Sequence, residues 1–212
     1  MNAVFSKLPK LIRRLSGRGP RAADFEPVYS NHPEDAWGYA HRPFEHQRFA
    51  LIIKALSTLC ASRILEVGCA EGHLTRLLAA RADDLLACDI VPEAVQRARH
   101  NSQDLNNIRF RTLDIRTQWP DETFNLIVYA DVLYYFTKKE IRRVIRSTAE
   151  HTVPGGSLLF ANEWHRHYRW MIHPETIMTM IRRSGLWKTV YTLRWPDTDS
   201  NRSITLGRFE RL

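Results

Sequence analysis

The chain has 212 residues, of which 44% are hydrophobic and 25% are charged, and its formal net charge is +8. This length and apolar content suit one α/β domain and exclude two full-sized ones. No apolar stretch approaches the roughly 20 residues that span a bilayer, and none has the form of a signal-peptide core, so we expect a soluble cytoplasmic protein.

The positive charge is concentrated at the N-terminus. Residues 1–23 hold six Lys and Arg and no acid, which leaves 25 basic against 23 acidic residues in the rest of the chain. We interpret residues 1–30 as a basic, flexible leader before a domain at 31–212. Because that domain is nearly neutral, nucleic acid is disfavoured as a partner. Apolar residues among the cations leave a peripheral membrane contact through residues 1–23 as an alternative.

The most informative segment, residues 64–75, joins an apolar strand to a helix. It places Gly68 and Gly72 where the backbone turns tightly and approaches a ligand, and the unpaired amides at the start of the helix can bind that ligand. A dinucleotide fingerprint would also need glycines at two positions that are Ala70 and His73 here. A nicotinamide site is therefore disfavoured.

Three further strand patterns reach a carboxylate. They are residues 85–90 with Asp89, 108–115 with Asp114, and 124–130 followed by Asp131. Asp89 lies 23 residues after Glu66, about where a βαβ unit places the acid that binds ribose hydroxyls.

Helical patterns at residues 73–81, 92–100 and 138–150 alternate with these strands and with a fifth strand at 157–161. The alternation predicts a doubly wound, mostly parallel α/β sheet with helices on both faces. The carboxylates then converge on one crevice at the carboxyl ends of the strands. Residues 186–193 and 203–209 fit a terminal hairpin.

The pattern Glu66-x-Gly68-x-x-x-Gly72 resembles motif I of class I S-adenosylmethionine-dependent methyltransferases, with Ala70 in place of a middle glycine. The resemblance implies S-adenosyl-L-methionine as cofactor and a Rossmann-like sheet in the order 3-2-1-4-5-7-6, with the last strand antiparallel. The cofactor contacts it implies are Glu66, Gly68, Cys69 and Gly72 in the turn, Asp89 and Ile90 at the ribose, Asp114 and Ile115 at the adenine, and Asp131 after the fourth strand.

A narrower resemblance comes from Trp37, from Pro-Phe-Glu-x-x-Arg ending at Arg48 in a helix expected at 44–59, and from Asp-Val-Leu-Tyr-Tyr at residues 131–135. Over residues 31–212 the chain resembles the NodS-type nodulation N-methyltransferases, which methylate the free amine of a partly deacetylated chitin oligosaccharide. The resemblance implies that Trp37 and Arg48 cap the cofactor, with Arg48 pairing its methionine carboxylate in a forked geometry.

Methyl transfer from a sulfonium needs an aligned nucleophile, and an ammonium must first lose a proton. We favour Asp131 and Tyr135 for this chemistry; Tyr134, Glu163, His165 and His167 are further candidates by position. Residues 164–172 mix aromatic and cationic side chains that suit a sugar acceptor. The pair His165 and His167 lacks a third ligand at a recognisable spacing, so no metal site is expected.

The acceptor predicted from these patterns is a small molecule, in particular the amine of an aminosugar or oligosaccharide. Two alternatives remain open: a methyltransferase that acts on RNA or protein, and a non-catalytic relative that only binds the cofactor. The chain contains no Asp/Asn-Pro-Pro-Tyr/Phe motif of base-amine methylation after the fourth strand, which disfavours the first alternative. The choice between N- and O-methylation is also open.

Overall fold

A computed structural model of the chain describes residues 19–32, 35–59, 61–165, 171–197 and 202–212. The basic residues 1–18 lie outside this part, so the membrane contact through residues 1–23 stays an alternative. The helices and strands are, in chain order, α2 (Ala22–Asn31), α3 (Pro43–Ala55), β1 (Arg63–Val67), α4 (His73–Ala79), β2 (Asp84–Asp89), α5 (Pro92–His100), β3 (Ile108–Thr112), β4 (Phe124–Ala130), the 3-10 turn η1 (Leu133–Tyr135), α6 (Lys138–Glu150), β5 (Thr152–His165), α7 (Pro174–Arg183), β6 (Trp187–Asp197) and β7 (Arg202–Arg211).

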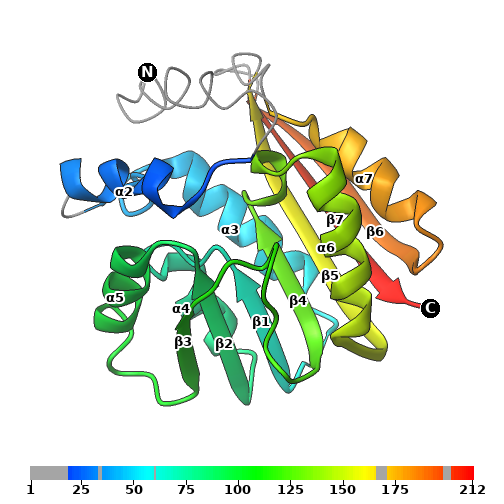
Figure 1. Ribbon diagram of the computed structural model, residues 1–212, viewed down its shortest axis with the longest axis horizontal. Helices are drawn as coiled ribbons and strands as arrows, with labels where there is room; N and C mark the ends of the chain where they lie inside the picture. The colour runs from blue at the N-terminus through cyan, green and yellow to red at the C-terminus, as the bar shows by residue number, and fades with distance from the viewer. Residues whose placement is uncertain (1–18, 33–34, 60, 166–170, 198–201) are drawn as a thin grey trace.

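Seven strands form one sheet in the order β3-β2-β1-β4-β5-β7-β6 (Figure 1). The first five strands pair in parallel, whereas β7 lies antiparallel between β5 and β6. The predicted α/β fold class, the strand order and the terminal hairpin are therefore confirmed. In this topology the carboxyl ends of β1, β2 and β4 share one edge of the sheet, where ligands bind in doubly wound folds.

Helices cover both faces of the sheet. Successive residues of a strand point to opposite faces, and in β1 Ile64 packs in a cluster with side chains of α3 and α4, while Leu65 packs in another with side chains of α6 and α7. Most residues of β1 and β2 are buried, which explains why they read as continuous apolar runs rather than as alternating patterns.

Local signals set the helix boundaries. Pro92 occupies the first turn of α5, where its fixed φ suits the helix and its missing N–H costs nothing. α6 starts with a capping box, because the hydroxyl of Thr137 accepts from the amide of Glu140 at 3.2 Å and the Glu140 carboxylate accepts from the amide of Thr137 at 2.8 Å. Its apolar positions Ile141, Val144 and Ile145 are buried.

The fifth strand differs from its prediction. Residues 154–156, which come before the strand expected at 157–161, lie within β5 at a break in its register with β4, and Gly155 has a positive φ of 72° there. β5 therefore extends beyond the predicted apolar run at both ends. Its C-terminal part places Glu163 at the edge of the sheet where ligands bind in this fold class.

Residues 22–31 belong to the folded body rather than to a flexible leader. They form α2, whose Phe25, Val28 and Tyr29 are buried against Trp37 and neighbouring residues. Figure 1 shows α2 lying across the end of the sheet. The predicted boundary at residue 31 is therefore too late for this helix, because aromatic burial outweighs its weak sequence pattern, which includes an internal proline.

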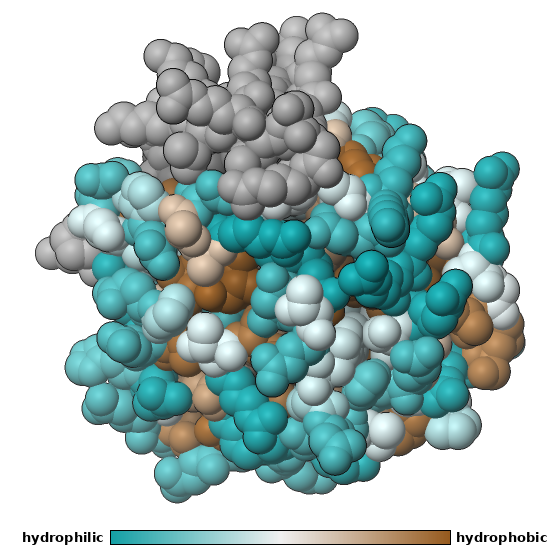
Figure 2. Space-filling view, viewed as in Figure 1, coloured by the Kyte–Doolittle hydropathy of each residue, from teal (hydrophilic) through white to brown (hydrophobic). Residues whose placement is uncertain are grey.

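The face seen in Figure 2 is covered mainly by hydrophilic residues, and hydrophobic residues show only in small patches. In the described part of the chain, none of the helices combines the length and the apolar character that crossing a bilayer would need. A cytoplasmic location stays a prediction.

Candidate active site

A cavity lies at the carboxyl ends of β1, β2 and β4, beneath α2. The empty space within it, its open mouth included, is about 820 Å³. Seven of the predicted site residues line it: Trp37, Gly68, Asp89, Ile90, Ile115, Asp131 and Tyr135. The other five predicted residues do not line the cavity: Arg48, Glu66, Cys69, Gly72 and Asp114.

The turn after β1 brings the backbone against the cavity. Gly68 has a φ of 80°, and a Cβ at this position would lie 2.4 Å from Cγ2 of Val132. Ala70 also has a positive φ, 47°, which explains why glycine is the usual residue there. Gly72, with a φ of 87°, begins α4 and approaches the Cα of Ala98 so closely that a Cβ would lie 3.1 Å away.

Asp89 is fixed at the end of β2 by the backbone. Its Oδ2 accepts from the amide of Ala70 at 3.1 Å, and its Oδ1 accepts from the amide of Val91 at 2.9 Å. Burial raises the pKa of its carboxyl to about 6, while the amide donors act to lower it. Asp89 thus joins the glycine turn to β2 at the place predicted for a ribose acid.

Glu66 and Cys69 are buried in the same region without lining the cavity. Oε2 of Glu66 has no hydrogen-bond partner among the described residues, and burial raises the pKa of this carboxyl to about 7. The amide of Cys69 donates to the carbonyl of Cys88 at 3.0 Å, and burial raises the pKa of its thiol well above the usual range. Their predicted contacts with the cofactor stay predictions.

Asp114 is already engaged by two arginines. Arg116 binds its two carboxylate oxygens in a forked geometry at 2.8 and 2.9 Å, and Arg21 approaches one of them at 3.4 Å. Its neighbours Leu113 and Ile115 line the cavity instead. Of the two residues predicted to contact adenine, Ile115 therefore lies at the cavity. The contact of the Asp114 carboxylate with adenine stays a prediction.

Arg48 is buried between two carboxylates. Its Nε and Nη2 lie 2.9 and 2.8 Å from Oε2 of Glu45, and its Nη1 lies 2.9 Å from Oδ2 of Asp131. The ring of Phe49 lies 4.7 Å from the guanidinium carbon. Two nitrogens of the Arg48 guanidinium thus bind Glu45, the kind of pairing that was expected with the cofactor. A contact of Arg48 with the methionine carboxylate of the cofactor stays a prediction.

Asp131 has a positive φ of 56°, which is rare outside glycine. Its Oδ1 accepts from the amide of Glu163 at 2.6 Å and from the Asn162 side chain at 3.3 Å, and Arg48 pairs with its Oδ2. These bonds hold the ends of β4 and β5 and helix α3 together. They describe a positioning role, and proton transfer by Asp131 stays a prediction.

Tyr135 lines the cavity from η1, where its ring packs edge-on against Phe25 at 5.1 Å. Burial raises the pKa of its phenol well above the usual value. A phenol that stays protonated donates hydrogen bonds but is a poor proton acceptor at neutral pH. The arrangement therefore suits Tyr135 to contact a ligand, and its catalytic role stays a prediction.

Three aromatic residues form a roof that was only partly predicted. Trp37 donates through its indole N–H to the hydroxyl of Tyr29 at 3.0 Å, and Phe25 packs 6.4 Å from the Trp37 ring. All three line the cavity. Phe25 and Tyr29 were missed because α2 lies in the assumed leader; the aromatic spacing of four residues was the signal that could have found them.

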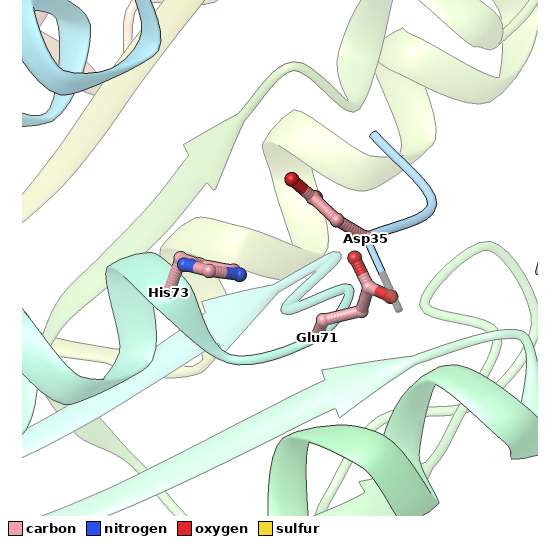
Figure 3. A group of neighbouring side chains, drawn as sticks. All are labelled: Asp35, Glu71 and His73. Carbon is pink, nitrogen blue, oxygen red and sulfur yellow. The ribbon is translucent and has the colours of Figure 1, made fainter. Parts of the chain in front are cut away.

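Glu71, in the glycine turn, joins this turn to the segment before Trp37 and lies beside Asp35 and His73 (Figure 3). Asp35, Glu71 and His73 lie with one ligand atom of each within 4.8 Å of the others, a grouping that can hold a metal ion. Glu71, however, already accepts from the amide of Ala36 with both oxygens, at 3.1 and 3.0 Å, and pairs with Arg97 at 3.0 Å. The Glu71 carboxylate is therefore already bonded to Ala36 and Arg97, and it joins the segment before Trp37 to the glycine turn.

The acceptor region expected at residues 164–172 lies largely outside the described residues, as do the side chains of His165 and His167. Trp164, on β5, packs its ring 4.5 Å from that of His173. The proposed contact of this segment with a sugar therefore stays a prediction.

The strand order, the glycine turn and Asp89 at the end of β2 together define a class I S-adenosylmethionine-dependent methyltransferase. The family model "Nodulation protein S (NodS)" matches residues 30–186, about three quarters of the chain. The chain therefore belongs to the NodS family of S-adenosylmethionine-dependent methyltransferases.

Individual relatives agree with this assignment. Nodulation protein S of Sinorhizobium fredii is 29% identical over 183 residues, which cover 84% of this chain and 84% of that protein. Nodulation protein S of Rhizobium tropici is 34% identical over 131 residues, 61% of this chain and 55% of that protein. The crystal structure of the N-methyltransferase NodS from Bradyrhizobium japonicum WM9 in complex with S-adenosyl-L-homocysteine superposes with a TM-score of 0.80 and 28% identity, over 90% of this chain and 97% of that one.

The cofactor is S-adenosyl-L-methionine, and the cavity fits it. Gly68 lines the cavity with backbone and without a side chain, and Asp89 sits where a ribose can donate to it. The adjoining wall is aromatic and acidic, which suits a sulfonium. These residues lie at the edge of the sheet where ligands bind in this fold class.

Proposed function

We propose that this methyltransferase acts on an amine, and that the amine belongs to an aminosugar or oligosaccharide. The observation that carries the proposal is the charge of the cavity. Four acids line it, Glu45, Asp89, Asp131 and Glu163, and among the described residues no Lys, Arg or His does. Arg42, Arg48 and Arg202 pair with three of these acids from outside the lining. The described lining therefore presents carboxylates and not guanidinium groups to an acceptor, which favours a cationic acceptor over a neutral hydroxyl.

The aromatic lining supports the same conclusion. Phe25, Tyr29, Trp37, Tyr39, Tyr134, Tyr135 and Phe136 surround the acids. Aromatic faces stabilise a cation by about 0.5–2 kcal/mol each, and more effectively where water is excluded. They also pack against the apolar C–H faces of a sugar ring. A wall of this kind suits both a sulfonium and a sugar ammonium.

The relatives also point to nitrogen. The Bradyrhizobium japonicum protein is an N-methyltransferase, and it matches this chain along nearly its whole length. The sugar acceptor rests on the family resemblance and on the aromatic wall. An RNA acceptor has no comparable support, because the described lining carries no cation to contact a phosphate.

Bound S-adenosylmethionine supplies an electrophilic methyl group. The chain supplies alignment, since an amine held about 3 Å from the methyl carbon and in line with the sulfur needs little further activation. The Arg48–Asp131 pair fixes the end of β4, and the Asp131–Glu163 bond fixes the end of β5. The acceptor amine is thus held against a rigid wall.

Methyl transfer to paired acceptors tests the proposal. Full-length protein and radiolabelled S-adenosylmethionine would be incubated with chitin oligomers that carry one free amine, and with fully N-acetylated oligomers of the same length. Label should enter only the free-amine oligomers, and mass spectrometry should place the methyl group on nitrogen.

Equal labelling of the acetylated oligomers, or methylation on oxygen, would contradict the amine proposal. A total RNA preparation and an amine without a sugar ring serve as comparison acceptors. Label confined to RNA would replace the proposed acceptor class, and label confined to the simple amine would retain nitrogen but remove the sugar.

A further inference from the structure

We propose that Glu163 is the catalytic group that takes the proton from the acceptor ammonium before methyl transfer. The inference rests on the proposed amine methylation and names a residue for it other than Asp131 and Tyr135. Glu163 lies near the carboxyl end of β5, beside the end of β4, and its buried side chain lines the cavity.

The bonds of the other cavity acids leave them poorly placed to accept a proton. Both oxygens of Asp89 accept from backbone amides, and the acceptor positions that remain are assigned to the ribose of the cofactor. Both oxygens of Asp131 are bonded, to Glu163, Asn162 and Arg48. Glu45 pairs through Oε1 with Arg42 at 3.0 Å and through Oε2 with Arg48 at 2.8 Å.

Glu163 differs from these three. In the described part of the chain, Oε1 of its carboxylate accepts no hydrogen bond, and its one ion partner is Arg202, whose Nη1 lies 3.3 Å away. The backbone amide of Glu163 is anchored to Asp131 at 2.6 Å, so the residue is fixed while its carboxylate stays available. A buried carboxylate with unused acceptor positions can receive an N–H from a ligand in the cavity.

The surrounding charges set the proton affinity of Glu163. Burial, together with the carboxylates of Asp131 and Glu45, raises the pKa of its carboxyl to about 7 against the lowering effect of Arg202 and Arg42. Tyr135, on η1, lines the same cavity, and its phenol stays protonated. A group that titrates near the working pH can both take a proton and release it.

The step can be written for an ammonium R–NH3⁺. One N–H proton passes to the Glu163 carboxylate, which leaves R–NH2 with a free electron pair. That pair forms the N–C bond to the methyl group as the C–S bond breaks and its electrons return to sulfur. The products are R–NH2–CH3⁺ and neutral S-adenosylhomocysteine, and Glu163 gives its proton to solvent.

The pH dependence of kcat for a free-amine chitin oligomer tests this role in wild type, Glu163→Gln and the control Glu210→Gln, which changes an exposed acid on β7. In wild type and control, kcat should rise with pH through about 7 as Glu163 ionises. In Glu163→Gln it should fall by about 100-fold or more at neutral pH. It should recover at a higher pH, where the amine loses its proton in solution.

Calorimetry with S-adenosylhomocysteine and thermal unfolding check that the variant folds and binds. Glu163→Asp, which retains a carboxylate, should keep the wild-type shape of the pH profile at a lower kcat. A Glu163→Gln profile of wild-type shape, or a loss that is equal at every pH, would overturn the role. If wild type methylates no amine but does methylate hydroxyl acceptors, the amine proposal itself fails, which is a distinguishable result.

Discussion

Two non-glycine residues at the site have positive φ values, Ala70 at 47° and Asp131 at 56°. Such conformations cost about 1–3 kcal/mol and persist where surrounding bonds impose them. For Asp131 those bonds come from Arg48, Asn162 and Glu163. For Ala70 the bond is from its amide to Asp89. The strain thus lies at the two strand ends that frame the cavity.

A substitution at Gly68 tests the close approach at the single-residue level. Gly68→Ala adds a Cβ 2.4 Å from Val132 Cγ2 at a φ of 80°, so it should lower the melting temperature and weaken S-adenosylhomocysteine binding by more than about tenfold, or about 1.4 kcal/mol. The control Gly155→Ala has a similar φ of 72° but open space around its Cβ.

Calorimetric titration and thermal unfolding of both variants provide the comparison. The control Gly155→Ala should be destabilised only by the cost of placing alanine at a positive φ. Its affinity for S-adenosylhomocysteine should equal that of wild type. Unchanged binding by Gly68→Ala would show that this turn does not approach the cofactor.

At the scale of elements, Arg97 on α5 holds the roof in place. Its guanidinium donates to the carbonyls of Tyr29 and His32 at 3.0 and 2.8 Å, and it pairs with Glu71 at 3.0 Å and Glu93 at 2.8 Å. It therefore links the end of α2, the glycine turn and α5. The sequence shows only its i,i+4 spacing from Glu93, because its other three partners, two backbone carbonyls and Glu71, are distant in the chain.

Replacing Arg97 should loosen α2. Arg97→Gln removes charged hydrogen bonds worth about 1.5–3 kcal/mol each, so amides of residues 22–31 should exchange faster and S-adenosylhomocysteine should bind at least about tenfold more weakly. Hydrogen exchange and calorimetry measure both effects. Arg99→Gln is the control, since Arg99 has one long bond, to the Phe110 carbonyl at 3.4 Å. Equal protection of α2 in the two variants would contradict the role.

The sequence predicted the central strands and helices well. The bounds of β4, α5 and α6 agree with their patterns, because long periodic segments and local caps define them. α2 was missed, since its helical pattern is weak and its stability comes from burial of Phe25 and Tyr29 against distant residues. Tertiary packing of this kind leaves little trace in a local pattern.

For the whole molecule, parallel topology explains why the candidate acids converge. Strands that run the same way end at one edge, so carboxylates at strand ends meet there, as Asp89 and Asp131 do. Topology does not fix which carboxylates remain available to a ligand. Asp114 binds Arg116 and Arg48 binds Glu45, pairings of near neighbours in sequence that depend on side-chain packing.

The central claim is that this edge of the sheet binds the adenosyl cofactor, and calorimetric titration with S-adenosylhomocysteine tests it most directly. Full-length wild type should bind, and Asp89→Ala should bind at least about tenfold more weakly, because ribose hydroxyls lose a charged acceptor. Asp104→Ala, which changes a carboxylate exposed to solvent, should bind like wild type. Absence of binding by wild type, or equal affinity of Asp89→Ala and wild type, would contradict the account.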